Sequence, residues 1–441
     1  MPWFTRLWVF QEVAFAKDIT VLCGEQSIPW WRLAQAVMHL HHKGVFLECE
    51  DLGTAGTGVK AVAEMEKVRQ KARECDMPRD LISVLLATSD TRCTDPRDKV
   101  YAVLGLVDDD ACARLETPIQ VEVDYDADAG QVYQRLAQKF IAARDLRILS
   151  CASQRGGTFL DESISIPSWV PDWTAIENDA PFIRYNMHTM FPQAQYLSSG
   201  QQPEIRSSNV LELPCVEIDQ VEAIVPATTF TKTPLVKRYR SLNDQVAMTK
   251  NAEWLKSCCQ LVAQGKTMEQ QQHPCQVEEG ISDEASYDPL WFVLAAGLSG
   301  NARPIEAYHE SYFARYVAFI NKIVGNPYEP RIVINDKNGV IAEVEAAVYL
   351  WSSKRLFGIT KGGRAVLVPM GTRKGDQIIL PAFSVVPLVV RHRGGGGEPC
   401  QGMLLGEAFV RDVMSGEYVE EFQKTHRRME DAANYAVWKI S

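Results

Sequence analysis

The stretch Asp95-Pro-Arg-Asp-Lys-Val-Tyr-Ala-Val-Leu-Gly-Leu106 carries the most informative local signals of the chain. Asp95 is suited to cap a helix, and Pro96 fits the first helical position, where the N–H that proline lacks would have no partner. Asp98 follows in the first turn, where the helix dipole favours a carboxylate. Apolar residues then recur at helical spacing, at Val100, Val103, Leu104 and Val107. The stretch therefore predicts a capped helix.

The charged start of this helix has two interpretations. Asp95, Arg97 and Asp98 could form a docking or switch surface, because they gather charge at one helix end. Alternatively, Asp95 caps the helix and Arg97 bridges the two acids, which is a structural role. The residue types favour the structural role.

The segments that follow predict a strand and a helix. Residues 119–125 alternate between apolar and polar side chains, which predicts a strand with one buried face. Asp128 is placed to cap the next helix. The inward face of that helix would consist of Val132, Leu136, Phe140 and Ile141.

The N-terminal segment is expected to hold helices around one strand. Apolar residues cover more than one face over 3–16, which predicts a deeply buried helix. The β-branched run over 19–23 predicts a strand that ends at a glycine. Further helices are expected over 30–41, with Ser27 as its cap, and over 59–73, after a loop at 51–58.

The segment Pro167-Ser-Trp-Val-Pro-Asp-Trp173 is a different kind of element. Its two prolines restrict the backbone, and its two tryptophans offer large apolar surfaces. Trp169 and Trp173 could line a ligand cleft. The pattern favours the other interpretation, in which they anchor a rigid corner against the core.

The last third of the chain consists of short apolar runs separated by glycine. Such runs, with a turn about every 10 residues, are typical of a small antiparallel sheet or barrel. The glycine stretches 362–363 and 394–397 lack the spacing of a phosphate-binding loop, which favours turns. The runs lie at 356–359, 365–368, 377–380, 385–390 and 403–409. A terminal helix over 418–438 is expected from Tyr418, Phe422, Met429, Ala433 and Val437.

Together these elements predict an α+β fold. It would have a partial α/β N-terminal region, a mixed middle region and a β-rich C-terminal unit that ends in a helix. The expected boundaries are 1–45, 46–150, 151–330 and 331–441. The length of 441 residues fits two or three domains, at roughly 150 residues per domain.

The composition excludes several classes of function. The chain has 46 basic and 56 acidic side chains, a net charge of −10, and lacks the clustered positive charge with which proteins bind nucleic acid. No run approaches the ~18–20 apolar residues of a membrane helix, and the first residues do not resemble a signal peptide. The 11 cysteines include no C-x-x-C pair, so we expect reduced thiols, no metal site and an intracellular location.

Several segments together resemble the fungal heterokaryon-incompatibility (HET) domain proteins. Trp3-Phe-Thr-Arg-Leu-Trp-Val-Phe-Gln-Glu-Val13 is similar to the family's W-F-x-R-x-W-x-x-Q-E segment, and 95–106 is similar to its D-P-R-D-K-V-Y-A-L-L-G-L block. The same order continues with Cys23-Gly24 and Trp30, Asp124-Tyr125, Pro167–Trp173, Gly371–Asp376 and Gly406-Glu407. The resemblance implies a role in nonself recognition and programmed cell death, as a signalling module with protein partners or self-association.

The resemblance also implies that the HET domain is truncated in this sequence. Members of the family normally carry further strands before the segment that begins at Trp3. Residues 1–45 would then be the C-terminal remnant of a HET domain. We therefore expect an exposed apolar helix that needs a partner.

A second resemblance concerns Trp8 and Glu12, which share one helix face at positions i and i+4. The sequence Trp8-Val-Phe-Gln-Glu12 resembles the W-C-x-x-E helix of TIR domains, to which HET domains are similar in fold. In NAD-cleaving TIR domains this glutamate is catalytic, because a carboxylate stabilises an oxocarbenium-like transition state. The resemblance implies that Glu12 is catalytic, that Trp8 supports it, and that NAD is a substrate while no cofactor is bound.

Two alternatives to this enzyme remain. Glu12 could be a structural carboxylate that pairs with Arg6 or caps a neighbouring loop, and the residues favour this structural role. The chain could also be an inactive remnant, and no activity is expected from the truncated form.

Overall fold

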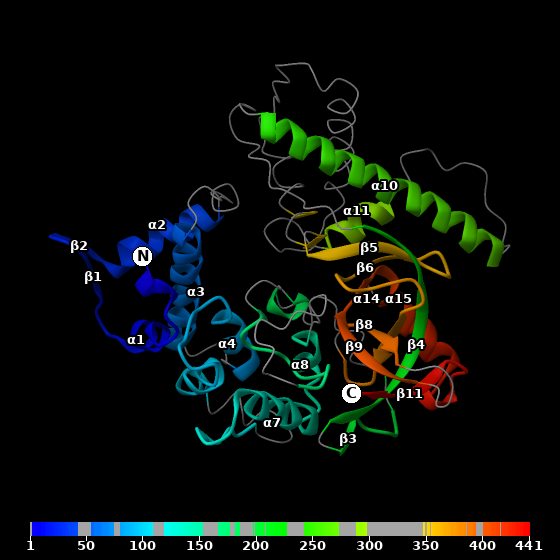
Figure 1. Cartoon of the computed structure of the whole chain (residues 1–441), viewed down its shortest axis with the longest axis horizontal. Coiled ribbons are helices and arrows are strands. Elements are labelled where there is room, and N and C mark those ends of the chain that lie inside the picture. Colours follow the sequence, from blue (N-terminus) through cyan, green and yellow to red (C-terminus); the bar gives the residue numbers. More distant parts are fainter. Residues whose placement is uncertain are drawn as a thin grey trace. The chain divides into compact units, whose positions relative to one another are not determined.

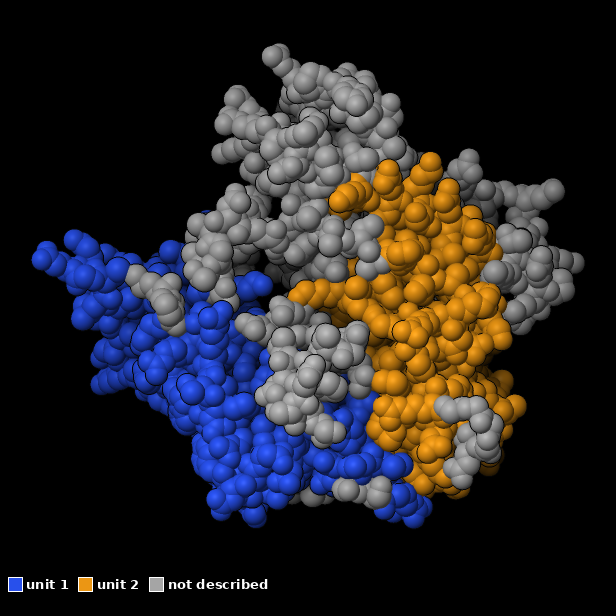
Figure 2. Space-filling view, viewed as in Figure 1, with its two compact units in different colours: residues 1–153, 158–184, 203–210 blue, residues 154–157, 185–202, 211–441 orange. Residues whose placement is uncertain are grey.

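The computed structural model describes residues 2–42, 54–74, 80–108, 119–152, 166–176, 181–185, 197, 199–207, 209–226, 242–272, 288–297, 347–348, 351–352, 354–384, 386–393, 400–414 and 416–441. The chain forms two compact units, shown in different colours in Figure 2. Unit 1 comprises 1–153, 158–184 and 203–210, and unit 2 comprises 154–157, 185–202 and 211–441. Helices and strands are both present, which confirms the α+β class.

Unit 1 is mainly helical (Figure 1). Its helices are α1 (Val9–Phe15), α2 (Trp30–His42), α3 (Thr54–Glu74), α4 (Leu81–Ala87), α5 (Asp98–Tyr101), α7 (Ala129–Ala142) and α8 (Arg147–Ser150). Its strands are β1 (Thr20–Cys23), β2 (Gln26–Pro29) and β3 (Glu204–Ser207). Short 3₁₀ helices are η1 (Pro2–Thr5), η4 (Leu104–Leu106) and, at the end of this region, η6 (Phe182–Tyr185).

Helix α1 is shorter than the sequence predicts. The expected helix over 3–16 is divided, because α1 begins only at Val9. The backbone of Arg92 donates a hydrogen bond of 2.6 Å to the Thr5 carbonyl and accepts one of 3.0 Å from the Leu7 N–H. These backbone groups are therefore engaged elsewhere and do not continue the helix. The apolar face is still buried, at Phe4, Leu7, Val9, Phe10, Val13 and Ala14.

Ser27 lies in a strand and does not cap a helix. It pairs with Leu22 in the antiparallel hairpin of β1 and β2, and α2 begins without it at Trp30. Gly24 closes the hairpin in the left-handed conformation (φ 61°), which glycine adopts without a steric penalty. Helix α3 likewise begins inside the expected loop, at Thr54.

Helix α7 begins where the sequence predicts. The Asp128 carboxylate accepts a hydrogen bond of 2.8 Å from the Gln131 N–H, and the Gln131 side chain completes a capping box. The four residues predicted to face inward are all buried. Burial of such a side chain contributes about 1.5–3 kcal/mol to stability, so this face holds the helix in unit 1.

Residues 119–125 do not form the expected strand. The Lys139 ammonium instead binds the Gln120 carbonyl. The Tyr101 hydroxyl donates to the Asp124 carbonyl and accepts from the Asp124 N–H, both at 3.1 Å. The alternation of apolar and polar residues predicted a strand. Among the described residues, side chains of unit 1 and not a neighbouring strand bind the backbone of this segment.

Unit 2 contains one large sheet (Figure 1). Among the described residues, β4, β11, β9, β8 and β7 pair in this order, and β7 pairs back with β4 to close a ring. Strands β5, β6 and β10 extend the sheet from β4. The bounds are β4 (Val210–Val225), β5 (Arg355–Thr360), β6 (Ala365–Pro369), β7 (Gln377–Pro381), β8 (Leu388–His392), β9 (Gln401–Glu407), β10 (Phe409–Val410) and β11 (Tyr435–Ile440). The expected short strands of the last third are therefore confirmed.

Strand β4 links the ring to its extension. It pairs with β11 over 211–216, with β7 over 215–220 and with β5 over 221–225. The register shifts between Glu217 and Asp219 and again between Val221 and Ala223. Such irregularities bend a strand, which lets β4 take part in both sections.

The chain ends in a strand, so the expected helix over 418–438 is wrong in its second half. Helix α15 covers only Glu417–Thr425, and β11 follows as a strand of the ring between β4 and β9. Trp438 on β11 is fully buried, and its indole N–H donates to a Glu217 carboxylate oxygen at 3.0 Å. The helical spacing of the last apolar residues is therefore coincidental.

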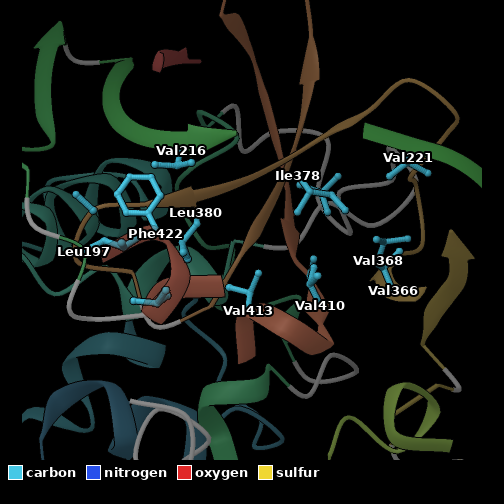
Figure 3. Close-up of a cluster of buried hydrophobic side chains, with 14 of the residues drawn as sticks. Leu197, Val216, Val221, Val366, Val368, Ile378, Leu380, Val410, Val413 and Phe422 are labelled. Carbon is cyan, nitrogen blue, oxygen red and sulfur yellow. The ribbon is translucent and has the colours of Figure 1, made fainter. Parts of the chain in front are cut away.

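The core of unit 2 consists of aliphatic side chains from the ring and its extension (Figure 3). Val216, Ile378 and Leu380 are fully buried, and Phe422 of α15 packs against the same cluster. The remaining helices are α10 (Leu242–Gln272), α11 (Asp288–Leu294), α14 (Arg411–Met414) and the 3₁₀ helix η9 (Met429–Asp431). The glycine run 394–397 lies outside the described residues.

Candidate functional site

The block at 95–106 and the pair Asp124-Tyr125 meet in unit 1. The Arg97 guanidinium donates to both Asp95 carboxylate oxygens, from Nε at 2.9 Å and from a terminal nitrogen at 2.7 Å. Its other terminal nitrogen donates to the backbone carbonyls of Tyr125 and, at 3.0 Å, Ala127. We call Asp95, Arg97, Asp98, Asp124 and Tyr125 the motif cluster.

Arg97 is the centre of the motif cluster. Its hydrogen bonds hold the pKa of the Asp95 carboxyl below its usual range, and the same contact raises the pKa of Arg97. The guanidinium carbon also lies 5.1 Å from the centre of the Tyr125 ring, in a cation–π arrangement. One arginine thus connects the helix start to the segment that follows 119.

Tyr125 and Asp98 form the second link. The Tyr125 hydroxyl donates to an Asp98 carboxylate oxygen at 2.7 Å, and this hydrogen bond raises the pKa of Tyr125 to about 12. The Tyr101 ring meets the Tyr125 ring edge to face, with centroids 5.2 Å apart. Asp124 is paired with Arg135 at 2.7 Å. The charges of the cluster are therefore largely balanced by side chains of unit 1.

The predicted structural role of the helix start needs correction in two details. Asp95 does not cap α5 directly, because Arg97 occupies the N-cap position and Asp95 accepts the Arg97 N–H at 2.9 Å in the preceding turn. Arg97 also does not bridge two acids. It binds Asp95 and two backbone carbonyls, while Asp98 binds a tyrosine. The planar guanidinium can serve several acceptors at once, which a local pattern does not reveal.

Sequence reasoning missed two residues that hold this region. The Gln11 side chain bonds to the Ala102 carbonyl and so joins the first motif to the second. The Lys99 ammonium is buried and donates to the carbonyls of Ser89 at 2.8 Å and Thr91 at 2.5 Å. A lysine inside an apolar helical run was the available signal, since a buried ammonium requires acceptors.

Trp8 and Glu12 lie four residues apart at α1, as predicted. Trp8 is 43% exposed, and the Glu12 N–H donates to its carbonyl at 3.4 Å. Within the described part of the chain, the Glu12 carboxylate has no ion pair and no hydrogen bond, so the expected pairing with Arg6 is not formed. Glu12 and Arg6 are both exposed.

Trp169 and Trp173 are both buried. Trp169 is 0% exposed, and its indole N–H donates to the Asn209 carbonyl at 3.2 Å. Trp173 is 1% exposed. Both rings are packed inside unit 1 and present no surface to solvent.

The distal motifs lie in unit 2 and form ion pairs. Arg391 donates two hydrogen bonds to the Asp376 carboxylate, at 2.8 and 2.7 Å, and a third to the Gly371 carbonyl. Arg355 pairs with Glu407 at 2.7 Å, and both side chains are buried. The motif at 371–376 therefore lies in the connection between β6 and β7, whereas 406–407 form the end of strand β9.

The glycines at 362–363 form a turn. The Gly362 N–H donates to the Asp219 carboxylate at 3.1 Å, and Arg364 binds the same carboxylate. A Cβ at Gly362 would lie 2.5 Å from that carboxylate, so a larger residue here would displace the Asp219 side chain. The Asp219 carboxylate thus already binds the Gly362 N–H and the Arg364 guanidinium, which are the donors that a phosphate would need.

The described ranges contain neither a metal-binding cluster nor a membrane-spanning helix. No group of three or more His, Cys, Asp or Glu side chains there is arranged to hold a metal ion. None of the described helices is long and apolar enough to span a membrane.

Comparison with known proteins gives one partial similarity. Over 194 residues the chain is 26% identical to heterokaryon incompatibility protein 6, OR allele, of Neurospora crassa. The match covers 39% of this chain and 28% of that protein, so it spans well under a third of the relative's length. No protein-family model and no solved structure matches the chain. The similarity supports, for part of the chain, the resemblance to heterokaryon-incompatibility proteins that the motifs indicate.

Proposed function

We propose that this chain acts inside fungal cells in heterokaryon incompatibility, as a protein-interaction module that recognises nonself and triggers cell death. The observation that carries the proposal is the similarity to the Neurospora incompatibility protein. The motif cluster supports a binding role because it leaves Tyr125 exposed. Arg97 and Asp98 are bound to partners within the chain, but Tyr125 remains accessible to another protein.

Expression of the chain in Neurospora crassa tests this function. An inducible gene for the chain is introduced into strains of different incompatibility type, and a frame-shifted copy serves as the control. We expect fewer colonies and more cells stained by a vital dye, in some strains and not in others. Equal colony numbers in all strains, with the protein detected by immunoblot, would overturn the proposal.

A second candidate function is hydrolysis of NAD by Glu12. The observation in its favour is the Glu12 carboxylate, which has no partner among the described residues and lies four positions after the exposed Trp8. A carboxylate without a local cation can stabilise a positively charged transition state.

The test incubates the purified chain with NAD and measures released nicotinamide by chromatography. Glu12→Gln should abolish the release, whereas Glu25→Gln, an exposed glutamate in the β1–β2 hairpin, should leave it unchanged. Absence of nicotinamide from the folded chain excludes this candidate.

A further inference from the structure

The segment 119–125 combines a strand-like sequence with an unpaired backbone. Within the described residues, the backbone groups of Val121, Glu122 and Val123 make no hydrogen bond. The segment is nevertheless held in place, because Lys139 binds the Gln120 carbonyl and Tyr101 binds the backbone of Asp124. It is thus an anchored segment with free backbone donors and acceptors.

The anchors determine which edge of the segment remains free. In an extended chain, the backbone groups of alternate residues point to the same edge. Gln120 and Asp124 are separated by an even number of positions, so their backbone groups point to the same edge. Both direct these groups to side chains of unit 1. The groups of Val121 and Val123 then point to the opposite edge, where a further strand could pair with them. This free edge ends at Tyr125, whose carbonyl accepts a hydrogen bond from Arg97.

The exposed side chains indicate the chemistry of that strand. Val123 is 57% exposed and Tyr125, two positions later, is 48% exposed, so both side chains offer apolar surface to a partner. Glu122 and Asp126 alternate with them, are exposed, and have no partner side chain among the described residues. No lysine or arginine occurs between 119 and 128. The cations that reach the segment bind other groups of it: Lys139 and Arg97 bind backbone carbonyls, and Arg135 pairs with Asp124.

We propose that this edge binds an extended segment of a partner protein in which apolar residues alternate with lysine or arginine. The backbone of the partner would pair with Val121 and Val123, its apolar side chains would cover Val123 and Tyr125, and its cations would meet Glu122 and Asp126. Strand addition gives affinity through the backbone and specificity through alternate side chains. The proposal deepens the proposed function, on which it rests, by naming the class of partner.

The test uses a fluorescein-labelled heptapeptide of alternating valine and lysine, titrated with the full chain and followed by fluorescence anisotropy. Val123→Asp and the double variant Glu122→Lys/Asp126→Lys should each weaken binding by at least about tenfold, as truncation of central contacts does. Leu22→Asp changes an apolar residue of β1 that is 72% exposed, more than Val123, and this control should bind as the wild type does. Circular dichroism establishes that each variant is folded.

Two peptide controls separate the parts of the proposal. A peptide N-methylated at alternate residues cannot pair through its backbone, and we expect it to lose binding. A valine–glutamate peptide should also fail to bind, because its charge is repelled. Equal binding of either control peptide, or no binding of the lysine peptide, would overturn the proposal. The incompatibility phenotype in Neurospora is measured in a separate experiment. A failure of the peptide to bind is therefore distinguishable from a failure of the proposed function.

Discussion

The Gln11 side-chain amide donates a hydrogen bond of 2.6 Å to the backbone carbonyl of Ala102, which lies 91 positions later in the chain. The two residues belong to two of the motifs that resemble heterokaryon-incompatibility proteins. Gly105 lies against the same side chain, since a Cβ there would be 3.1 Å from Gln11 Nε2. The motifs are therefore parts of one packed structure in unit 1.

Substitution of Gln11 by alanine should destabilise unit 1. The buried Ala102 carbonyl would lose its partner, and a buried acceptor left unsatisfied costs about 1–3 kcal/mol. Hydrogen exchange measured by mass spectrometry should show faster exchange in 98–106. Gln26→Ala, on the exposed hairpin, is the control, and identical exchange in the two variants would contradict the role of Gln11.

Gly402 should tolerate no side chain. A Cβ there would lie 2.2 Å from the Arg391 carbonyl oxygen and 2.9 Å from the Trp438 ring. Overpacking of this kind costs about 1–3 kcal/mol, so Gly402→Ala should lower the melting temperature of unit 2. Gly200→Ala places its Cβ at an ordinary 3.5 Å from the nearest atom and should melt like the wild type. Equal melting temperatures for both variants would show that β8 and β9 pack differently.

Trp438 should be essential to the ring of strands. The side chain is fully buried on β11, between β4 and β9, and substitution of such a tryptophan by alanine costs about 3–5 kcal/mol. Urea unfolding should therefore begin at a much lower concentration in Trp438→Ala. The control Trp31→Ala removes a ring that is 60% exposed and should change stability little. A small effect of Trp438→Ala would instead fit a surface helix at the C-terminus.

Tyr125 should titrate later than an ordinary tyrosine. Its hydrogen bond to Asp98 raises the folded-state pKa to about 12, above the unfolded value of 10.0. The stabilising contribution is complete below pH 10.0 and is lost as the pH rises through about 12. Ultraviolet difference titration of wild type against Tyr125→Phe isolates this phenol, and Asp98→Asn should bring its pKa down. A titration at 10.0 in the wild type would show that the hydrogen bond is not formed.

The sequence predicts local elements well where the signal lies within a few residues. The capping box at Asp128 and the short strands between 355 and 410 are examples. Caps, alternation and glycine turns are signals that lie within or next to the element they determine. The strand β11 was missed, since it is defined by pairing with β4, more than 200 positions earlier. Residues 119–125 show the converse, because their alternation satisfies the strand pattern while the side chains of Tyr101 and Lys139 bind their backbone.

The candidate site was predictable in its residues but not in its contacts. The charges at Asp95, Arg97 and Asp98 are evident in the sequence. Nothing in that block indicates that Tyr125 is the partner of both Arg97 and Asp98, because the segment between 107 and 124 separates them. Long-range hydrogen bonds of this kind depend on the packing of unit 1, which is determined by the whole chain.

The most direct measurement of the central claim compares variants of the chain in the Neurospora expression assay. The claim is that the chain acts by binding a protein partner through the edge next to the motif cluster. We predict that Glu122→Lys/Asp126→Lys restores colony numbers to those of the frame-shifted control, whereas Glu12→Ala remains as toxic as the wild type. Restoration by Glu12→Ala, with the double charge variant still toxic, would contradict the claim and favour the enzyme.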